Sequence, residues 1–213
     1  MAEEEAMQLS KPFKTITPTL DGDILAVLAR QDTTFTTGQL HRILVRPSEE
    51  GIRKVLRRLT KQGIVQSDRV GNAYAYRLNR DHLAADCIIG LARLQETLLS
   101  RLKSRLESWE VPPIYAAVFG SAARGSMTAE SDLDLLLIRP HEVHDVLWET
   151  HVNDLVSDMN RWLGNDVRPL QFTGVELASR GADEPVLQSV LEEGLTVAGS
   201  RTWLARHLRR EKD

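Results

Sequence analysis

Apolar residues in the first third of the chain recur at helical spacing. Residues 20–28 carry Leu, Ile, Val and Leu side chains three or four positions apart, which predicts one helix. A second, short helix is predicted to run through Leu44, with Thr36 or Thr37 as its N-cap. Two consecutive short helices of this kind indicate a small helical module near the start of the chain.

A third helix and a hairpin complete this module. Ser48 is a suitable N-cap, and the apolar positions then continue at helical spacing to about Lys61. Short β-like runs at 64–66 and 74–78 flank a Gly71-Asn72 turn. The order of helix, helix, basic helix and hairpin resembles a winged helix-turn-helix.

The pattern changes in the rest of the chain. Leucines three or four apart predict one long helix over residues 81–109, which Pro112-Pro113 ends. A nearly continuous apolar run at 133–138 is typical of a central strand. The other expected elements are strands at 114–119 and 167–172, and helices at 141–163, 175–178, 184–193 and 202–210.

These elements predict an α+β chain of four parts. Residues 1–18 are expected to be a flexible leader, 19–80 a winged helix-turn-helix domain, 81–111 a connecting helix, and 112–213 a second domain with a short mixed sheet and C-terminal helices. Charge supports the division, since Leu20 to Arg80 holds eleven basic and six acidic residues, whereas the remainder to Asp213 holds fourteen and twenty-one.

Composition excludes several classes of protein. Apolar residues make up 42% and charged residues 27%, as in globular proteins. No apolar run reaches the roughly 18 residues of a membrane span, and the acidic N-terminus is unlike a secretory signal. Cys87 is the only cysteine, which excludes an internal disulfide and a zinc site with paired cysteines. We therefore expect a cytoplasmic protein without a membrane partner.

The candidate chemistry lies around the 133–138 strand. Gly120 and Ser121 follow the end of a strand, where a glycine-containing turn into a helix suits an anion such as a triphosphate. Asp132 and Asp134 are two apart on the next strand, so their carboxylates point to one side. Paired carboxylates repel unless a cation holds them, and Mg²⁺ prefers carboxylate and phosphate oxygens. This combination predicts metal-assisted phosphoryl or nucleotidyl transfer.

The run Gly-Ser-Ala-Ala-Arg-Gly at 120–125, followed by Ser-Asp-Leu-Asp-Leu at 131–135, resembles the signature of DNA polymerase beta-like nucleotidyltransferases, and is most similar to the minimal prokaryotic members. The resemblance covers about residues 112–195. It implies that Asp132 and Asp134 hold Mg²⁺ or Mn²⁺ and that an NTP is the substrate or ligand. The residues that it implies for nucleotide binding are Gly120, Ser121, Arg124 and Ser131. Arg124 is alternatively a surface residue or an ion-pair partner of Glu130.

One position departs from the family pattern. A third catalytic carboxylate is expected on the following strand, but its register there holds Arg168. Asp166, two residues earlier, either substitutes as the third catalytic acid beside Asp132 and Asp134 or only ends the preceding loop. Glu176 is a weaker candidate. Arg168 is expected to pair with one of the two aspartates or with a phosphate.

The basic third helix predicts binding to double-stranded DNA. The candidate DNA-binding residues are Arg53, Lys54, Arg57, Arg58, Lys61 and Arg69. A solvated basic face or a protein-docking module are the alternatives, and Glu49 and Glu50 would face DNA phosphates poorly. A homodimer is expected, because winged helices often bind paired half-sites. His141, His144 and His151 either share a metal or form a polar helix surface.

Two hypotheses for function follow. The first is an enzyme that uses Mg²⁺ to transfer a nucleoside monophosphate from an NTP to an acceptor. The second is a winged-helix transcriptional regulator whose nucleotidyltransferase fold is a catalytically weak or inactive nucleotide sensor. The intact run from Gly120 to Asp134 favours the first, and Arg168 favours the second.

Overall fold

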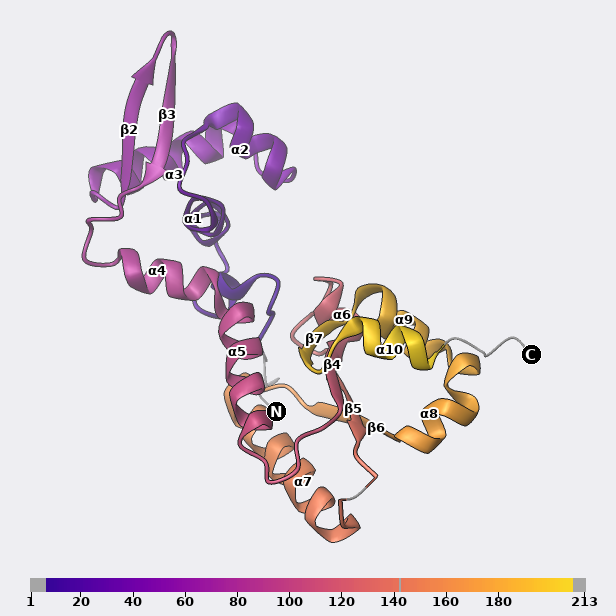
Figure 1. Ribbon diagram of the computed structural model, residues 1–213. Coiled ribbons are helices and arrows are strands. Elements are labelled where there is room, and N and C mark those ends of the chain that lie inside the picture. The colour runs from indigo at the N-terminus through magenta and orange to yellow at the C-terminus, as the bar shows by residue number, and fades with distance from the viewer. Residues whose placement is uncertain (1–6, 142, 209–213) are drawn as a thin grey trace. The chain divides into compact units, whose positions relative to one another are not determined.

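The computed structural model describes residues 7–141 and 143–208 (Figure 1). They form two compact units, one of residues 11–95 and one of the described residues before 11 and after 95. Each unit has its own apolar core and is described by itself. The α+β class and the winged-helix character of the first unit agree with the sequence prediction.

The unit of residues 11–95 is a winged helix. Its elements are η1 (Pro12–Thr15), α1 (Leu20–Arg30), β1 (Phe35–Thr36), α2 (Thr37–Leu44), α3 (Glu49–Lys61), β2 (Val65–Val70), β3 (Ala73–Leu78) and α4 (Ala85–Ala92). The three strands form an antiparallel sheet in the order β1-β3-β2. Ile24, Leu28, Leu40, Ile52 and Leu56 are fully buried at its centre. The apolar positions that predicted the helices thus form one core.

Local signals determine where α2 and α3 begin. Thr36 caps α2 in a reciprocal capping box with Gln39, and Ser48 accepts a hydrogen bond from the Gly51 backbone at the start of α3. Val45 between them has φ +62°, and the Arg46 amide donates to the Leu44 carbonyl across it. A β-branched residue is strained in this conformation, so the turn from α2 to α3 is held by the elements on both sides.

The second unit is built on a four-stranded sheet. Its elements are α5 (Leu94–Glu107), β4 (Tyr115–Phe119), α6 (Gly120–Ala123), β5 (Leu133–Arg139), α7 (Asp145–Leu163), β6 (Val167–Thr173), α8 (Gly174–Arg180), η2 (Gly181–Asp183), α9 (Pro185–Glu193), β7 (Leu195–Ala198) and α10 (Arg201–His207). The strand order is β6-β5-β4-β7, with β5 and β6 parallel and the other pairs antiparallel.

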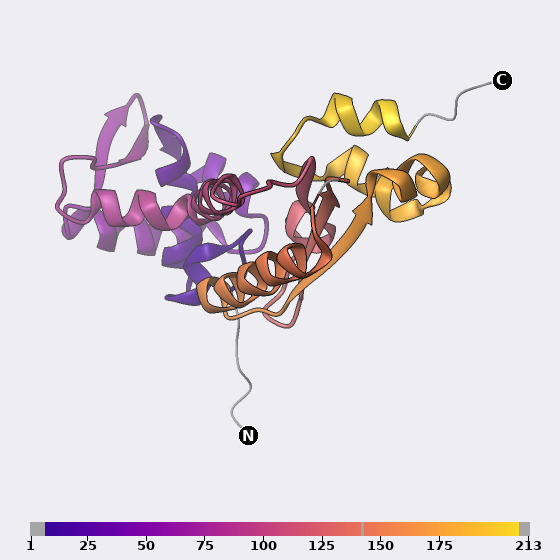
Figure 2. The same ribbon diagram turned by 60° about the horizontal axis from the view of Figure 1, so that its bottom comes forward.

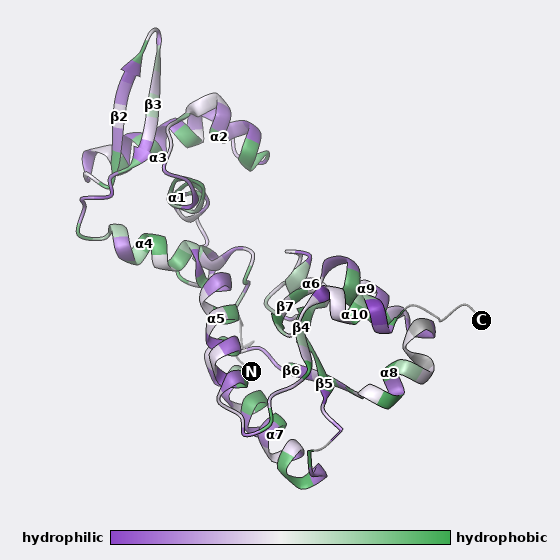
Figure 3. Cartoon of the chain, viewed as in Figure 1, coloured by the Kyte–Doolittle hydropathy of each residue, from purple (hydrophilic) through white to green (hydrophobic). Residues whose placement is uncertain are grey.

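Helices cover both faces of this sheet. Leu133, Leu135 and Leu137 pack with residues of α5 and α7 on one face, whereas Leu136 and Ile138 pack with residues of α9 and α10 on the other. In Figure 2, α7 lies along the first of these faces as a long orange helix. Figure 3 shows hydrophobic colouring on β4 and β5. Burial on both faces explains why β5 is an uninterrupted apolar run.

Two expectations about the chain outside the cores were wrong. The proposed flexible leader is packed from residue 7 onward, since Leu9 is 2% exposed and Phe13 is 4% exposed, each in the core of a different unit. Residues 1–6 of that leader lie outside the described residues. The predicted single helix over 81–109 is divided into α4 and α5 at Arg93. Ile88 and Ala92 of α4 pack into the winged-helix core, which is why that unit extends to residue 95.

In the second unit, one helix start differs from the prediction and one strand was not predicted. The helix expected from His141 begins at Asp145, and residue 142 lies outside the described residues. The strand β7 was missed, because four residues that form an edge strand give too short a pattern to identify.

Candidate functional site

The loop after β4 holds its shape through Gly120. This residue has φ +69°, and a Cβ atom added to it would lie 2.2 Å from Oδ2 of Asp134. A side chain at this position would therefore displace the carboxylate as well as strain the backbone. The close approach brings the backbone of the Gly120-Ser121 turn against Asp134. The predicted binding of an anion at this turn stays a prediction.

The two aspartates lie at the start of β5. Asp132 immediately precedes the strand and Asp134 is its second residue, so both face the side opposite to the fully buried Leu133 and Leu135. The pKa of Asp134 is raised above its ordinary value, first because the carboxyl is partly removed from water and then because Asp132 is close by. Arg168 and Arg124 act in the opposite direction. The pair is thus a site where an added cation is favourable.

Arg168 lies beside these carboxylates on β6. It is opposite Asp134 in the parallel β5–β6 ladder, and its Nη2 lies 2.7 Å from Oδ2 of Asp132. The expectation that this arginine pairs with one of the two aspartates is confirmed. Its side chain is 71% exposed, whereas that of Asp132 is 26% exposed. The guanidinium therefore reaches the carboxylate from the solvent side.

The alternative acids occupy other environments. Asp166 is an exposed residue whose carbonyl accepts a hydrogen bond from the Leu133 amide at 2.8 Å, so its backbone fixes the start of β5. Glu176 accepts hydrogen bonds from the Thr173 amide and hydroxyl in the capping box of α8. In the described part of the chain, no three His, Cys, Asp or Glu side chains form a group that could hold a metal ion. Asp166 as a catalytic acid stays a prediction.

Arg124 has a partner that the sequence did not indicate. Its Nη1 lies 2.5 Å from Oε1 of Glu193 on α9, so the suggested ion pair with Glu130 is wrong and Glu193 takes its place. Ser189 also donates to Glu193, and these two hydrogen bonds, Arg124 first, lower the pKa of the Glu193 carboxyl. A link between residues 69 positions apart has no local sequence signal.

Asn165 was overlooked and positions the loop before Asp132. It is 3% exposed, and its side-chain amide donates to the Ser131 carbonyl at 3.0 Å. Its Oδ1 accepts from the Met7 amide at 3.0 Å. The Ser131 hydroxyl, predicted to contact nucleotide, accepts from the Thr128 amide at 3.0 Å. A polar residue directly after Gly164 was the only sequence signal for this role.

The residues around β5 fit one divalent cation with a nucleotide. Asp132 and Asp134 offer carboxylate oxygens on one side of the sheet, and a bound nucleotide would add phosphate oxygens, which is a donor set that Mg²⁺ accepts. Arg168 stands where a further carboxylate was expected, and a guanidinium has no lone pair to offer a metal. This position thus lacks the third carboxylate that was expected for a second ion.

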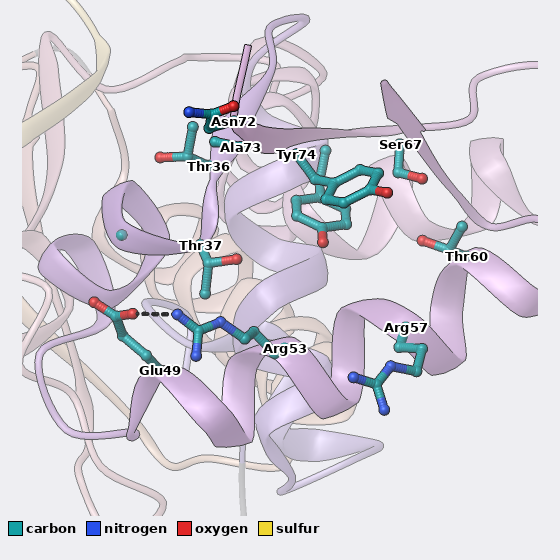
Figure 4. A pocket seen from close by; sticks show the side chains of 12 residues that line it. Thr36, Thr37, Glu49, Arg53, Arg57, Thr60, Ser67, Asn72, Ala73 and Tyr74 are labelled. Carbon is teal, nitrogen blue, oxygen red and sulfur yellow. Dashed lines mark hydrogen bonds and ion pairs between the residues drawn. The ribbon is translucent and has the colours of Figure 1, made fainter. Parts of the chain in front are cut away.

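The winged-helix unit has a groove between α3 and the β2–β3 hairpin, with a volume of about 690 Å³. The residues that line this α3–hairpin groove include Thr36, Thr37, Arg53, Arg57, Tyr74 and Tyr76. Figure 4 shows Arg53 and Arg57 along α3, with Arg53 joined to Glu49 at 2.8 Å. Guanidinium, hydroxyl and aromatic groups around an open groove suit a nucleic-acid backbone.

The other predicted DNA contacts do not line this groove. Arg58 pairs with Asp21 and donates to Gln62, and Arg69 donates to the Gly71 carbonyl. Lys54 and Lys61 are exposed elsewhere on α3. The structure thus brings together only Arg53 and Arg57 of the six candidates.

The histidine stretch does not form a metal site in the part of the chain that is described. His151 instead packs its ring 5.0 Å from that of Trp109, which in turn makes an edge contact with Trp148.

None of the helices in the described part of the chain is long and apolar enough to cross a bilayer.

Comparison with family models finds two matches along the chain. Residues 19–86 match the penicillinase repressor family, and residues 97–169 match the nucleotidyltransferase domain family. The two matches fall in the two structural units, and the second includes the Gly120-Ser121 turn, both aspartates of β5 and Arg168.

Curated relatives match part of their own length only. Bifunctional uridylyltransferase/uridylyl-removing enzymes of Vibrio vulnificus strains YJ016 and CMCP6 are each 25% identical over 138 residues. This match covers 63% of the present chain and 15% of each relative.

Among solved structures, a toxin–antitoxin complex with AMP-PNP is 18% identical, with a TM-score of 0.38, over 52% of this chain and 80% of that one. A tri-AMPylated Shewanella oneidensis HEPN toxin in complex with MNT antitoxin is 15% identical, with a TM-score of 0.36, over 54% and 80%. The family matches identify the two parts of the molecule: the chain joins a penicillinase repressor-like winged-helix domain to a nucleotidyltransferase domain.

Proposed function

We propose that the site at the start of β5 binds an NTP with Mg²⁺ and transfers its nucleoside monophosphate to an acceptor hydroxyl. The observation that carries this proposal is the close approach of the Gly120 backbone to Asp134, since a Cβ on Gly120 would lie 2.2 Å from Oδ2 of that carboxylate. The match of residues 97–169 to the nucleotidyltransferase domain supports it.

In this reaction the acceptor oxygen forms a bond to the α-phosphorus, and the bond from the α-phosphorus to the oxygen that bridges to the β-phosphorus breaks. Pyrophosphate leaves with that oxygen, and the proton of the acceptor hydroxyl is released to water. A bound Mg²⁺ supplies charge neutralisation on the phosphates. Asp132 and Asp134 would hold that ion, while the backbone at Gly120 and Ser121 would orient the triphosphate. Arg124, after exchange of its bond to Glu193, would neutralise a phosphate oxygen.

The test is label transfer. The full chain is incubated with each α-labelled NTP and Mg²⁺ or Mn²⁺, and pyrophosphate release and labelled products are measured. UTP comes first because the curated relatives are uridylyltransferases. We expect the signal to fall by at least about 100-fold in Asp132→Ala/Asp134→Ala, the loss typical of removing groups that stabilise transition-state charge. Equal turnover by this variant would disprove the proposal.

A second candidate function rests on the Arg168–Asp132 ion pair. The guanidinium of Arg168 already pairs with the Asp132 carboxylate. This pairing favours nucleotide binding without turnover, so the domain would act as the nucleotide sensor of a DNA-binding regulator. Measurable binding of an NTP with no pyrophosphate release in any candidate acceptor mixture would support the sensor over the enzyme.

We propose double-stranded DNA as the partner of the winged-helix unit. The α3–hairpin groove with Arg53 and Arg57 supports this, as does the match to the penicillinase repressor family. Affinity for a fragment from the chain's own promoter should fall steeply with salt. A homodimer on paired half-sites is part of the proposal, and sedimentation of the DNA complex would reveal the number of copies.

A further inference from the structure

The parallel pairing of β5 and β6 fixes a cation beside the carboxylates. Arg168 is the ladder partner of Asp134, so their side chains leave the sheet on the same side. Asp132, two residues before Asp134, shares that side, and Arg168 reaches it at 2.7 Å. The guanidinium therefore lies where it can contact both Asp132 and a ligand that the two carboxylates bind.

Arg168 cannot take over the part of a metal ligand. A guanidinium carries five N–H donors and no acceptor, and it stays charged at every relevant pH. A second divalent ion beside Asp134 would meet this positive charge in place of a ligand. Among the described residues, no third His, Cys, Asp or Glu side chain joins Asp132 and Asp134 in a group that could hold a metal ion.

The same properties suit Arg168 to a phosphate. Its planar fork can donate two parallel hydrogen bonds to phosphate oxygens. Its present bond is readily exchanged, because the arginine side chain is 71% exposed and water screens an ion pair at the surface. A divalent cation on Asp132 competes with the guanidinium for that carboxylate, and the nucleotide that accompanies the cation brings phosphate oxygens to which the displaced guanidinium could donate.

We propose that the site holds one divalent cation with its nucleotide, and that Arg168, released from Asp132, binds a phosphate of that nucleotide. This inference rests on the proposed binding of an NTP at β5. It assigns Arg168 as a nucleotide-binding residue and makes the β5 site a one-ion site, whether or not transfer follows.

Nucleotide affinity provides the first test. UTP binding to the full chain, with the other three NTPs in parallel, is measured by calorimetry in Mg²⁺ and in EDTA. Arg168→Ala is expected to weaken binding about tenfold, the loss of roughly 1.4 kcal/mol, and Arg168→Lys to recover part of it. Arg161→Ala is the matched control, because Arg161 is also 71% exposed and also pairs with a carboxylate, Asp158 on α7.

Metal stoichiometry provides the second test. With Mn²⁺ and UTP, the electron paramagnetic resonance spectrum of the wild type should be that of isolated ions. Arg168→Asp places a carboxylate opposite Asp134 and should give the spectrum of a coupled ion pair, as expected for two metals about 3.5–4 Å apart.

The outcomes separate two kinds of failure. A coupled pair in the wild type, or unchanged nucleotide affinity in Arg168→Ala, overturns the role of Arg168 while the NTP site stands. If the wild type binds none of the four NTPs, the proposed function itself fails and Arg168 loses its ligand with it. Weakened binding in Arg168→Ala but not in Arg161→Ala, with isolated Mn²⁺ in the wild type, supports the inference.

Discussion

The two units of this chain hold their charged side chains in opposite ways. In the winged-helix unit, the exposed Arg53 and Arg57 border an open groove, and neither belongs to that unit's core. In the nucleotidyltransferase unit, Asp134 is half-buried against the backbone of Gly120 and follows a fully buried leucine. Charge on a surface helix can be removed without disturbing the fold, whereas charge at the start of a central strand is linked to the packing around it.

The strongest test of this comparison asks whether the two cores are independent. Leu56→Ala in the first unit and Trp148→Ala in the second remove fully buried side chains, so we expect losses of about 2–5 and 3–5 kcal/mol in the free energy of unfolding. Each variant should shift only the transition of its own unit in urea denaturation. Leu83→Ala, at a fully exposed position, is the control. One common transition, shifted by both variants, would contradict independent folding.

Asn165→Ala tests how strongly the loop before Asp132 depends on one buried amide. The variant leaves the Met7 amide and the Ser131 carbonyl without this partner, which should cost about 1–3 kcal/mol in the second unit only. Asn153→Ala, at an exposed position on α7, is the matched control. A loss no larger than that of the control would show that Asn165 does not hold the loop.

Arg53→Ala/Arg57→Ala tests whether the surface charges of the winged-helix unit contribute to DNA binding without contributing to stability. DNA affinity should fall about tenfold at moderate salt, and the slope of log affinity against log salt should become shallower by about 1.8, since each phosphate contact contributes about 0.9. Thermal stability should be nearly unchanged. Lys103→Ala/Arg161→Ala removes the same charge from exposed positions of the second unit. An equal fall in affinity for this control would remove the case for the groove.

The smallest effect concerns Asp134 and pH. Its folded pKa is raised, mainly by burial, so the unprotonated form is disfavoured in the folded state. The stability that it contributes is present below its ordinary pKa of 3.8 and is lost as pH rises through the folded value. Asp134→Asn should therefore melt slightly above the wild type at pH 7, with the difference shrinking below pH 3.8. Asp154→Asn, an exposed acid on α7, is the control, and a larger gain in that variant would contradict the assignment.

Much of the fold was predictable because its signals are local. Periodicity located α1 and α3, the Ser48 cap fixed a helix start, and the apolar run of 133–138 identified a strand buried on both faces. The helix break at Arg93 was not predictable, since the leucine spacing continues across it and the break follows from α4 packing into a different core from α5.

In the candidate site, too, contacts set by strand spacing and register were predictable, and other contacts between distant residues were not. The same-side placement of Asp132 and Asp134 follows from their spacing, and the approach of Arg168 from strand register. The Arg124–Glu193 pair could not be predicted, because it depends on how α9 folds back onto the sheet. The contacts of Asn165 likewise join residues far apart in the sequence.

The packing of residues 7–10 makes the winged-helix domain an insertion. Leu9 is buried in the core of the nucleotidyltransferase unit, and the chain returns to that unit only after residue 95. The inserted domain is thus joined to the nucleotidyltransferase unit at both of its ends, and a cleavage between residues 95 and 96 leaves it covalently attached only to the residues before 11. A fragment that starts at residue 96 would lack Leu9 and the Met7 amide that Asn165 binds. Expression of the nucleotidyltransferase unit alone should therefore graft residues 7–10 onto it through a short linker.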